Sequence, residues 1–185
     1  MSATTQAALP TARSMAWTPV AVTATGLVAV AALSRATDRG TPLALSLTVG
    51  ALAALAVLAL RDPAAALLAA VPLSAWRRRG LRLAWIAVAV LPVWLVVTAL
   101  LPAAGLGTAF PALLALSTCA LAVAVWVPDG KDPGRAAALP LLWVAAGSTV
   151  GSFGGPVGDV SLLWREHPWP LLAVAGVLLA AGSSR

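Results

Sequence analysis

The side chains of this chain that could do chemistry gather in one segment, where Arg165, Glu166 and His167 are adjacent and Asp159 lies nearby. A histidine beside carboxylates can bind a metal ion or exchange protons. Neighbouring side chains point in different directions, however, and His167 is the only histidine of the chain. A solvated outer loop is therefore the favoured interpretation, and the sequence predicts no catalytic, metal or cofactor site.

Nucleophiles and nucleotide-binding motifs give no stronger signal. Ser148, Thr149 and Ser152 have no base within the apolar segments to activate them, which argues against an intramembrane protease. The single cysteine, Cys119, lies in an apolar segment, where helix packing is the simplest role. The phosphate-binding pattern Gly-x-x-x-x-Gly-Lys-Ser/Thr is absent, so we do not expect the chain itself to bind ATP.

The composition indicates which elements carry these residues. Hydrophobic residues make up 61% of the 185 positions and charged residues only 10%, whereas soluble domains carry roughly 25% charged residues. The ionisable side chains lie between the long apolar segments, so the sequence predicts no ionisable chemistry inside a membrane. The length suits one bundle. The net charge of +6 comes from arginines beside apolar segments, which membrane topology explains better than nucleic-acid binding.

Six segments approach the ~20 apolar residues that a helix needs to cross a bilayer. Their predicted ranges are about Trp17–Ser34, Pro42–Leu60, Leu83–Pro102, Gly107–Val127, Ala136–Gly151 and Pro168–Gly182. The last two are short, and four spans with two buried half-helices is an open alternative. The predicted fold is an all-α integral membrane protein, with a cytoplasmic segment over residues 1–16 and a single six-helix transmembrane domain over residues 17–185.

Basic residues between the apolar segments predict the orientation of the chain. Nine would lie on one side of the membrane: Arg13, Arg61, Arg77, Arg78, Arg79, Arg82, Lys131, Arg135 and Arg185. Three would lie on the other: Arg35, Arg39 and Arg165. Because Lys and Arg are retained in the cytoplasm, both termini are predicted there, which requires an even number of spans. The first segment is longer than the core of a signal peptide and is predicted to be an anchor.

Tryptophans have two predicted roles. Those near span boundaries are typical of an interfacial aromatic belt: Trp17, Trp126, Trp164 and Trp169. Those inside spans could pack against helices, contact lipid or line a substrate path: Trp85, Trp94 and Trp143.

The longest predicted cytoplasmic connection covers residues 61–82. Asp62 followed by Pro63 is typical of a helix start, with aspartate as the cap and proline at the first helical position. Alanines and leucines then favour a helix that Pro72 ends. A basic cluster returns the chain to the membrane surface: Arg77, Arg78, Arg79 and Arg82. The residues alone leave open whether this helix anchors to lipid headgroups or docks a cytoplasmic partner.

This plan resembles the type-2 ATP-binding-cassette (ABC) exporter permeases, bacterial membrane subunits with a short cytoplasmic helix between their second and third spans. The loop of that family contains a turn of the form Leu-Leu-Ala-x-Pro, and residues 67–74 here read similarly, as Leu-Leu-Ala-Ala-Val-Pro-Leu-Ser. The resemblance implies six spans, pairing with a second permease subunit, the same or related, and a separate ATPase subunit bound at this coupling helix. The residues expected to bind that partner are Asp62, Leu67, Leu68, Val71 and Leu73.

Three glycines near the end of the fifth segment, Gly147, Gly151 and Gly155, recur four residues apart. On one helix they would form a smooth stripe that lets another helix approach closely. A flexible glycine-rich turn is the alternative. The resembling family uses its fifth helix in the dimer contact and folds the region matching residues 152–167 into short re-entrant helices on the outer side.

The expected function, taken from the resemblance, is a permease subunit of an ATP-driven exporter in a bacterial plasma membrane. ATP hydrolysis is expected on the separate chain, and the uncharged apolar segments favour an amphipathic or lipophilic substrate. The expected partners are the ATPase, the second permease subunit and the lipid bilayer, with no nucleic acid. The alternative is a structural or accessory membrane subunit without its own transport path.

Overall fold

The computed structural model of the protein describes residues 12, 15–58, 75–101, 106–126, 133–151 and 154–183. Over these ranges the regular structure is entirely helical. The helices are α2 (Trp17–Thr37), α3 (Thr41–Leu58), α4 (Ala75–Leu100), α5 (Leu106–Trp126), α6 (Pro133–Thr149), α7 (Gly155–Glu166) and α8 (Pro168–Ser183).

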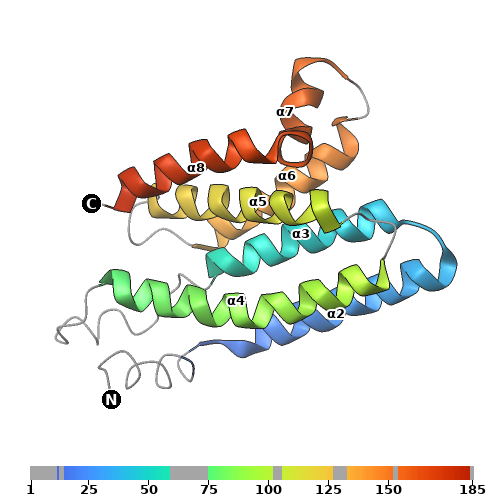
Figure 1. Ribbon diagram of the computed structural model, residues 1–185, viewed down its shortest axis with the longest axis horizontal. Coiled ribbons are helices and arrows are strands. Elements are labelled where there is room, and N and C mark those ends of the chain that lie inside the picture. The colour runs from blue at the N-terminus through green and yellow to red at the C-terminus, as the bar shows by residue number, and fades with distance from the viewer. Residues whose placement is uncertain are drawn as a thin grey trace.

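Six of these helices run alternately up and down one long axis, and the short α7 lies across it (Figure 1). As a result, α2 begins and α8 ends at the same end of the bundle. Four helices are long and apolar enough to cross a membrane, over Trp17–Thr37, Thr41–Leu58, Gly80–Leu100 and Ala109–Trp126. The apolar parts of α6 and α8 are shorter. The described residues are thus helical throughout, and four of their helices suit a multi-pass membrane protein by length and composition.

Helix α4 differs from the predicted third span, because it begins at Ala75 instead of Leu83. The basic residues of this region therefore lie in the first turns of a helix and not in a connecting loop. Alanine, leucine and arginine all favour helical backbone, so the helix extends through the basic stretch. The prediction placed the start of this span where continuous hydrophobicity begins, and so left the basic residues outside it.

Helix α3 is the centre of the bundle and packs against α2, α4, α5 and α6. Half of its residues are buried, with Leu52, Ala53 and Val57 almost fully enclosed. Gly50 lets α6 approach closely, since a Cβ there would lie only 3.1 Å from Cγ2 of Val144. Small residues on α3 therefore allow it to sit among four neighbouring helices.

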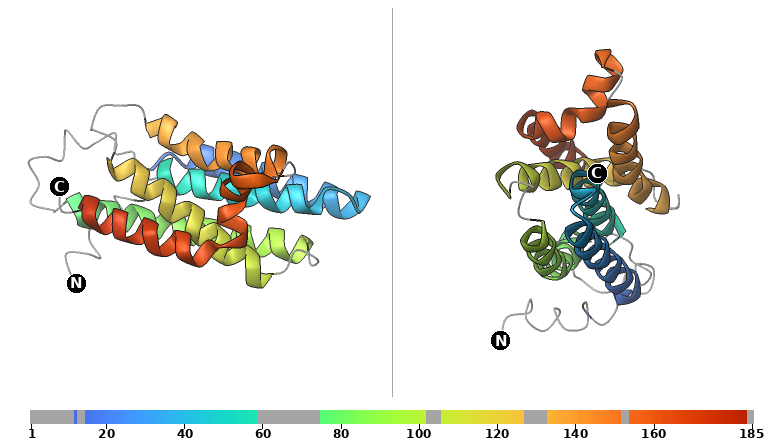
Figure 2. Two further views of the ribbon diagram at one scale, coloured as in Figure 1. Left: turned by 90° about the horizontal axis from the view of Figure 1, so that it is seen from above. Right: turned by 90° about the vertical axis from the view of Figure 1, so that its right-hand side faces the viewer.

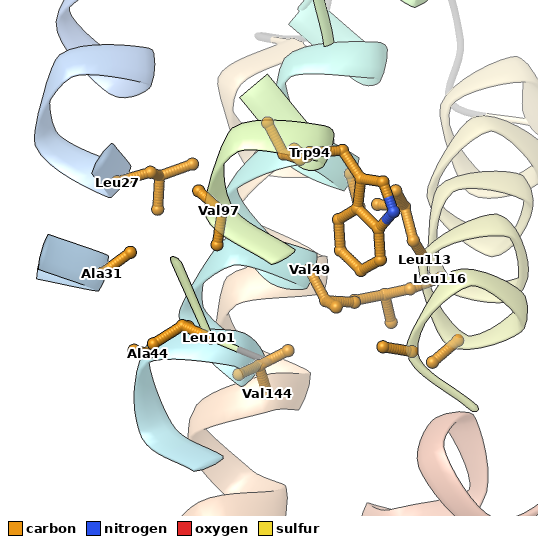
Figure 3. Close-up of a cluster of buried hydrophobic side chains, with 14 of the residues drawn as sticks. Leu27, Ala31, Ala44, Val49, Trp94, Val97, Leu101, Leu113, Leu116 and Val144 are labelled. Carbon is orange, nitrogen blue, oxygen red and sulfur yellow. The ribbon is translucent and has the colours of Figure 1, made fainter. Parts of the chain in front are cut away.

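Large apolar side chains fill the space around α3 (Figure 3). Trp94 of α4 is buried and its ring centroid lies 6.4 Å from that of Phe110 of α5, at an interplanar angle of 52°. Val97 and Leu116 lie in the same cluster and are fully enclosed. Of the roles open to Trp94, the structure therefore shows helix packing.

The turn between α2 and α3 is held by backbone and side-chain bonds. Asp38 adopts a left-handed conformation with φ 50°, and the N–H of Arg39 donates to the carbonyl oxygen of Ser34 at 3.2 Å. This pattern satisfies carbonyls that a helix end leaves unpaired. Arg35 Nη1 donates to the carbonyl oxygen of Ala99 at 3.3 Å, which joins the end of α2 to the end of α4.

Candidate functional site

The segment predicted to bind a cytoplasmic partner falls outside the described residues. This applies to all its predicted contact residues: Asp62, Leu67, Leu68, Val71 and Leu73. The helix ends on either side of it are described. Leu58 ends α3 and Ala75 begins α4 at the end of the bundle where α2 also begins. The role of this segment stays a prediction.

The predicted basic cluster lies at the start of α4, and most of its side chains fall outside the described residues. Arg77, Arg78 and Arg79 lie in the first turns of α4, where the backbone is described and the side chains are not. Arg82 belongs to the same helix, but its side chain is only 4% exposed. The side chain of Arg82 is thus enclosed within the protein, and a role of the cluster at the membrane surface stays a prediction.

Helix α7 packs closely against the end of α6 at the opposite end of the bundle. We call Gly147 and Gly151, with the α7 residues against them, the glycine seam. A Cβ at Gly147 would lie 2.9 Å from the carbonyl oxygen of Ser161, and a Cβ at Gly151 would lie 2.9–3.1 Å from three side-chain carbons of Leu162. Both glycines thus let α7 approach within the same chain.

The third glycine of the predicted stripe, Gly155, does not lie on the same helix. Helix α6 ends at Thr149, and Gly155 begins α7 with φ +75°, after Gly154 with φ +70°. A Cβ at Gly155 would have no atom within 4 Å. A single stripe of three glycines on one helix is therefore wrong, because α6 ends at Thr149 and Gly155 belongs to the start of α7. An intersubunit contact through α6 stays a prediction.

Two tryptophans, one on α6 and one on α7, lie beside the glycine seam. Trp143 Nε1 donates to the carbonyl oxygen of Val160 at 3.2 Å, which joins α6 to α7. Trp164 of α7 is only 3% exposed, and its Nε1 has no hydrogen-bond acceptor among the described residues. The prediction that Trp164 belongs to an interfacial belt is wrong, because α7 folds back and buries the ring in the main core.

The ionisable residues at this end are spread over the surface. Asp159, Arg165, Glu166 and His167 are all exposed. Within the described part of the chain, no three histidine, cysteine, aspartate or glutamate residues are grouped so that they could hold a metal ion. This end of the bundle therefore offers apolar surface and close helix–helix contacts, and its charged side chains are exposed.

Sequence reasoning missed two bonds that connect helices at this end. Arg35 was assigned to an outer loop, yet it bonds to a carbonyl 64 residues away. Trp143 was placed inside a span, where packing, lipid contact and a substrate path were all open, and the structure shows it bonded to α7. Each acceptor is a backbone oxygen on another helix, and such a partner leaves no local pattern in the sequence.

Comparison with known proteins identifies no relative: no family model, no curated protein and no solved structure matches the chain.

Proposed function

We propose that the chain is the membrane-spanning permease subunit of an ATP-driven exporter in a bacterial plasma membrane. It would pair with a second permease subunit and with a separate ATPase. The observation that carries the proposal is the filled centre of the bundle, where Trp94, Val97 and Leu116 are enclosed around α3. Because side chains occupy that centre, a substrate path is better placed between two copies than within one.

The outer surface of the bundle supports the same arrangement. Helices α2 and α4 expose many apolar side chains, among them Val22, Leu33, Val88 and Leu95. A path bounded by such surfaces would suit an amphipathic or lipophilic compound, because it offers apolar contact without charge. The substrate would move outward between the paired bundles.

The ends of the helices support the position of the proposed coupling segment. Residues 59–74 connect the end of α3 to the start of α4, at the end of the bundle where α2 starts and α8 finishes. Arg77, Arg78 and Arg79 begin α4 at the same end. Basic residues next to spans are retained in the cytoplasm, so an ATPase would meet this end.

A second candidate is a structural or accessory membrane subunit without its own path. The same filled centre favours it, because a bundle with a solid core needs no transport function to explain its packing.

Purification of the tagged chain in lipid nanodiscs from its native membranes distinguishes the two candidates. A permease should retain a subunit that hydrolyses ATP, and vanadate should inhibit that hydrolysis. Replacing Leu67 and Leu68 by aspartate should abolish the retained ATPase activity while the chain still inserts. The matched control replaces Arg77, Arg78 and Arg79 by glutamine, which should weaken membrane seating at ~1 kcal/mol per charge but keep the ATPase.

Two results would decide against the permease. Wild-type chain that carries no ATP-hydrolysing subunit would favour the accessory candidate. The same holds if the Leu67→Asp, Leu68→Asp variant keeps every partner of the wild type, because the coupling segment would then have no role.

A further inference from the structure

Trp164 carries a buried N–H group that the fold leaves without a partner. The side chain is enclosed in the main core, and Nε1 has no hydrogen-bond acceptor among the described residues. Across the glycine seam it faces Gly147, where a Cβ would lie 3.3 Å from Nε1. Most buried donors in proteins are hydrogen-bonded, and an unpaired donor destabilises the state that buries it. The contact between α6 and α7 is therefore less stable than its apolar packing alone would make it.

The face by which α7 is attached to the bundle is narrow. Its buried residues are Gly158, Ser161 and Trp164, and Trp164 has the only large side chain of these three. The rest of α7 stands out from the side of the bundle, as Figure 1 and the right-hand view of Figure 2 show. An element with so few buried side chains belongs to the part of a fold that opens most easily.

Both ends of α7 interrupt the helical backbone. Gly154 and Gly155 have φ +70° and +75°, and a Cβ at either position would have no atom within 4 Å. At the other end only His167 separates α7 from α8. Helix α8 then begins with Pro168, whose missing N–H prevents the backbone bonds of α7 from continuing into α8. The helix can therefore move as a unit about its two ends.

We propose that α7 is a latch, closed when Trp164 enters the main core and open when the helix swings out about Gly154–Gly155 and His167. In the closed form the unpaired N–H opposes the apolar packing, and in the open form water or a lipid headgroup can accept its hydrogen bond. Opening uncovers the core side chains beneath Trp164, so the latch controls access to the core from this end. The proposal concerns the fold of one chain and does not depend on ATP-driven export.

Thiol modification of the full chain in lipid nanodiscs tests the latch. Ser161 is replaced by cysteine in a Cys119→Ala background, because its side chain lies on the buried face of α7 and is only 6% exposed. Methyl methanethiosulfonate, a small neutral reagent, should modify Ser161→Cys only when the latch is open, so the rate measures the open fraction. Asp159→Cys, at an exposed position of the same helix, gives the rate of a site that needs no opening.

The same chemical change at two tryptophans should have opposite effects on this rate. Benzothienylalanine has nearly the shape of tryptophan, with sulfur in place of the N–H group. At Trp164 it removes an unpaired donor and should slow modification of Ser161→Cys on the order of tenfold. At Trp143 it removes the donor that bonds to Val160, and should speed the modification several-fold. Neither change should alter the rate for Asp159→Cys.

Three results would overturn the proposal. Equal rates for Ser161→Cys and Asp159→Cys would show that the seam is not closed. No modification of Ser161→Cys would show that α7 does not open. An unchanged or faster rate with benzothienylalanine at Trp164 would show that its N–H group does not oppose the closed form.

Discussion

Replacing Gly147 by alanine tests the glycine seam between α6 and α7. The added Cβ would lie 2.9 Å from the carbonyl oxygen of Ser161 and 3.3 Å from Trp164 Nε1. The first of these atoms belongs to the backbone of α7, so no side-chain rotation can make room. Helix α7 must instead move away from α6, which would strain the bond from Trp143 to Val160.

The magnitude follows from two opposing effects. Alanine favours helix over glycine by up to ~1 kcal/mol, whereas overpacking typically costs about 1–3 kcal/mol. The matched control is Gly26→Ala on α2, where a Cβ would meet no atom within 4 Å. Gly26→Ala gains the higher helix propensity of alanine without a clash. The Gly147→Ala variant should therefore be less stable than the Gly26→Ala variant by about 2 kcal/mol.

Thermal melts of the purified chain, followed as the loss of monodisperse protein on size-exclusion chromatography, measure this difference. For a chain of this size, about 2 kcal/mol corresponds to a Tm difference on the order of 5 °C. Gly151→Ala should have a smaller effect, because its Cβ meets only the side chain of Leu162. Leu162→Ala should then relieve the Gly151 variant. Equal Tm values for Gly147→Ala and Gly26→Ala would refute the close approach of α7.

The remaining predictions concern the core, the α2–α4 bond and the topology. Trp94→Ala should lower the free energy of unfolding by about 3–5 kcal/mol, because it empties part of the core, and thermal melts would detect this. Arg35→Gln should cost about 0.5–1.5 kcal/mol in the same assay through loss of the bond to Ala99, and no change would show that the bond is not maintained. In a cysteine-free background, Asp38→Cys should react with an impermeant maleimide from outside intact cells and Gly130→Cys should not; the reverse would contradict the orientation.

The sequence predicted the long apolar helices well because their hydrophobicity is continuous. Pro42–Leu60 and Gly107–Val127 match α3 and α5 to within two residues at each end. Continuous hydrophobicity did not locate the start of α4, because Arg77–Arg79 are helical without being apolar. Helix propensity and hydrophobicity are separate properties. The helix already begins at Ala75, whereas continuous hydrophobicity begins only at Leu83.

The arrangement at the α7 end was harder to predict. Gly147 and Gly151 were recognised as surfaces for close helix approach, but the sequence could not specify which helix approaches. Trp164 has the residue type and position of an interfacial anchor, and only the fold of α7 back onto α5 and α6 buries it. Contacts between distant segments decide such cases, and local patterns do not carry that information.

The central position of α3 has a consequence for the order in which the protein is made. Of the described helices only α2 precedes α3, and α4, α5 and α6, three of the four helices that enclose α3, follow it in the chain. The two hydroxyl groups in the interior of this helix are already satisfied without them, because Thr48 and Ser46 donate to the carbonyl oxygens of Ala44 and Pro42, each at 2.8 Å. Such a helix can remain in lipid on its own while the ribosome completes its neighbours, and then exchange lipid contacts for protein contacts as each one inserts.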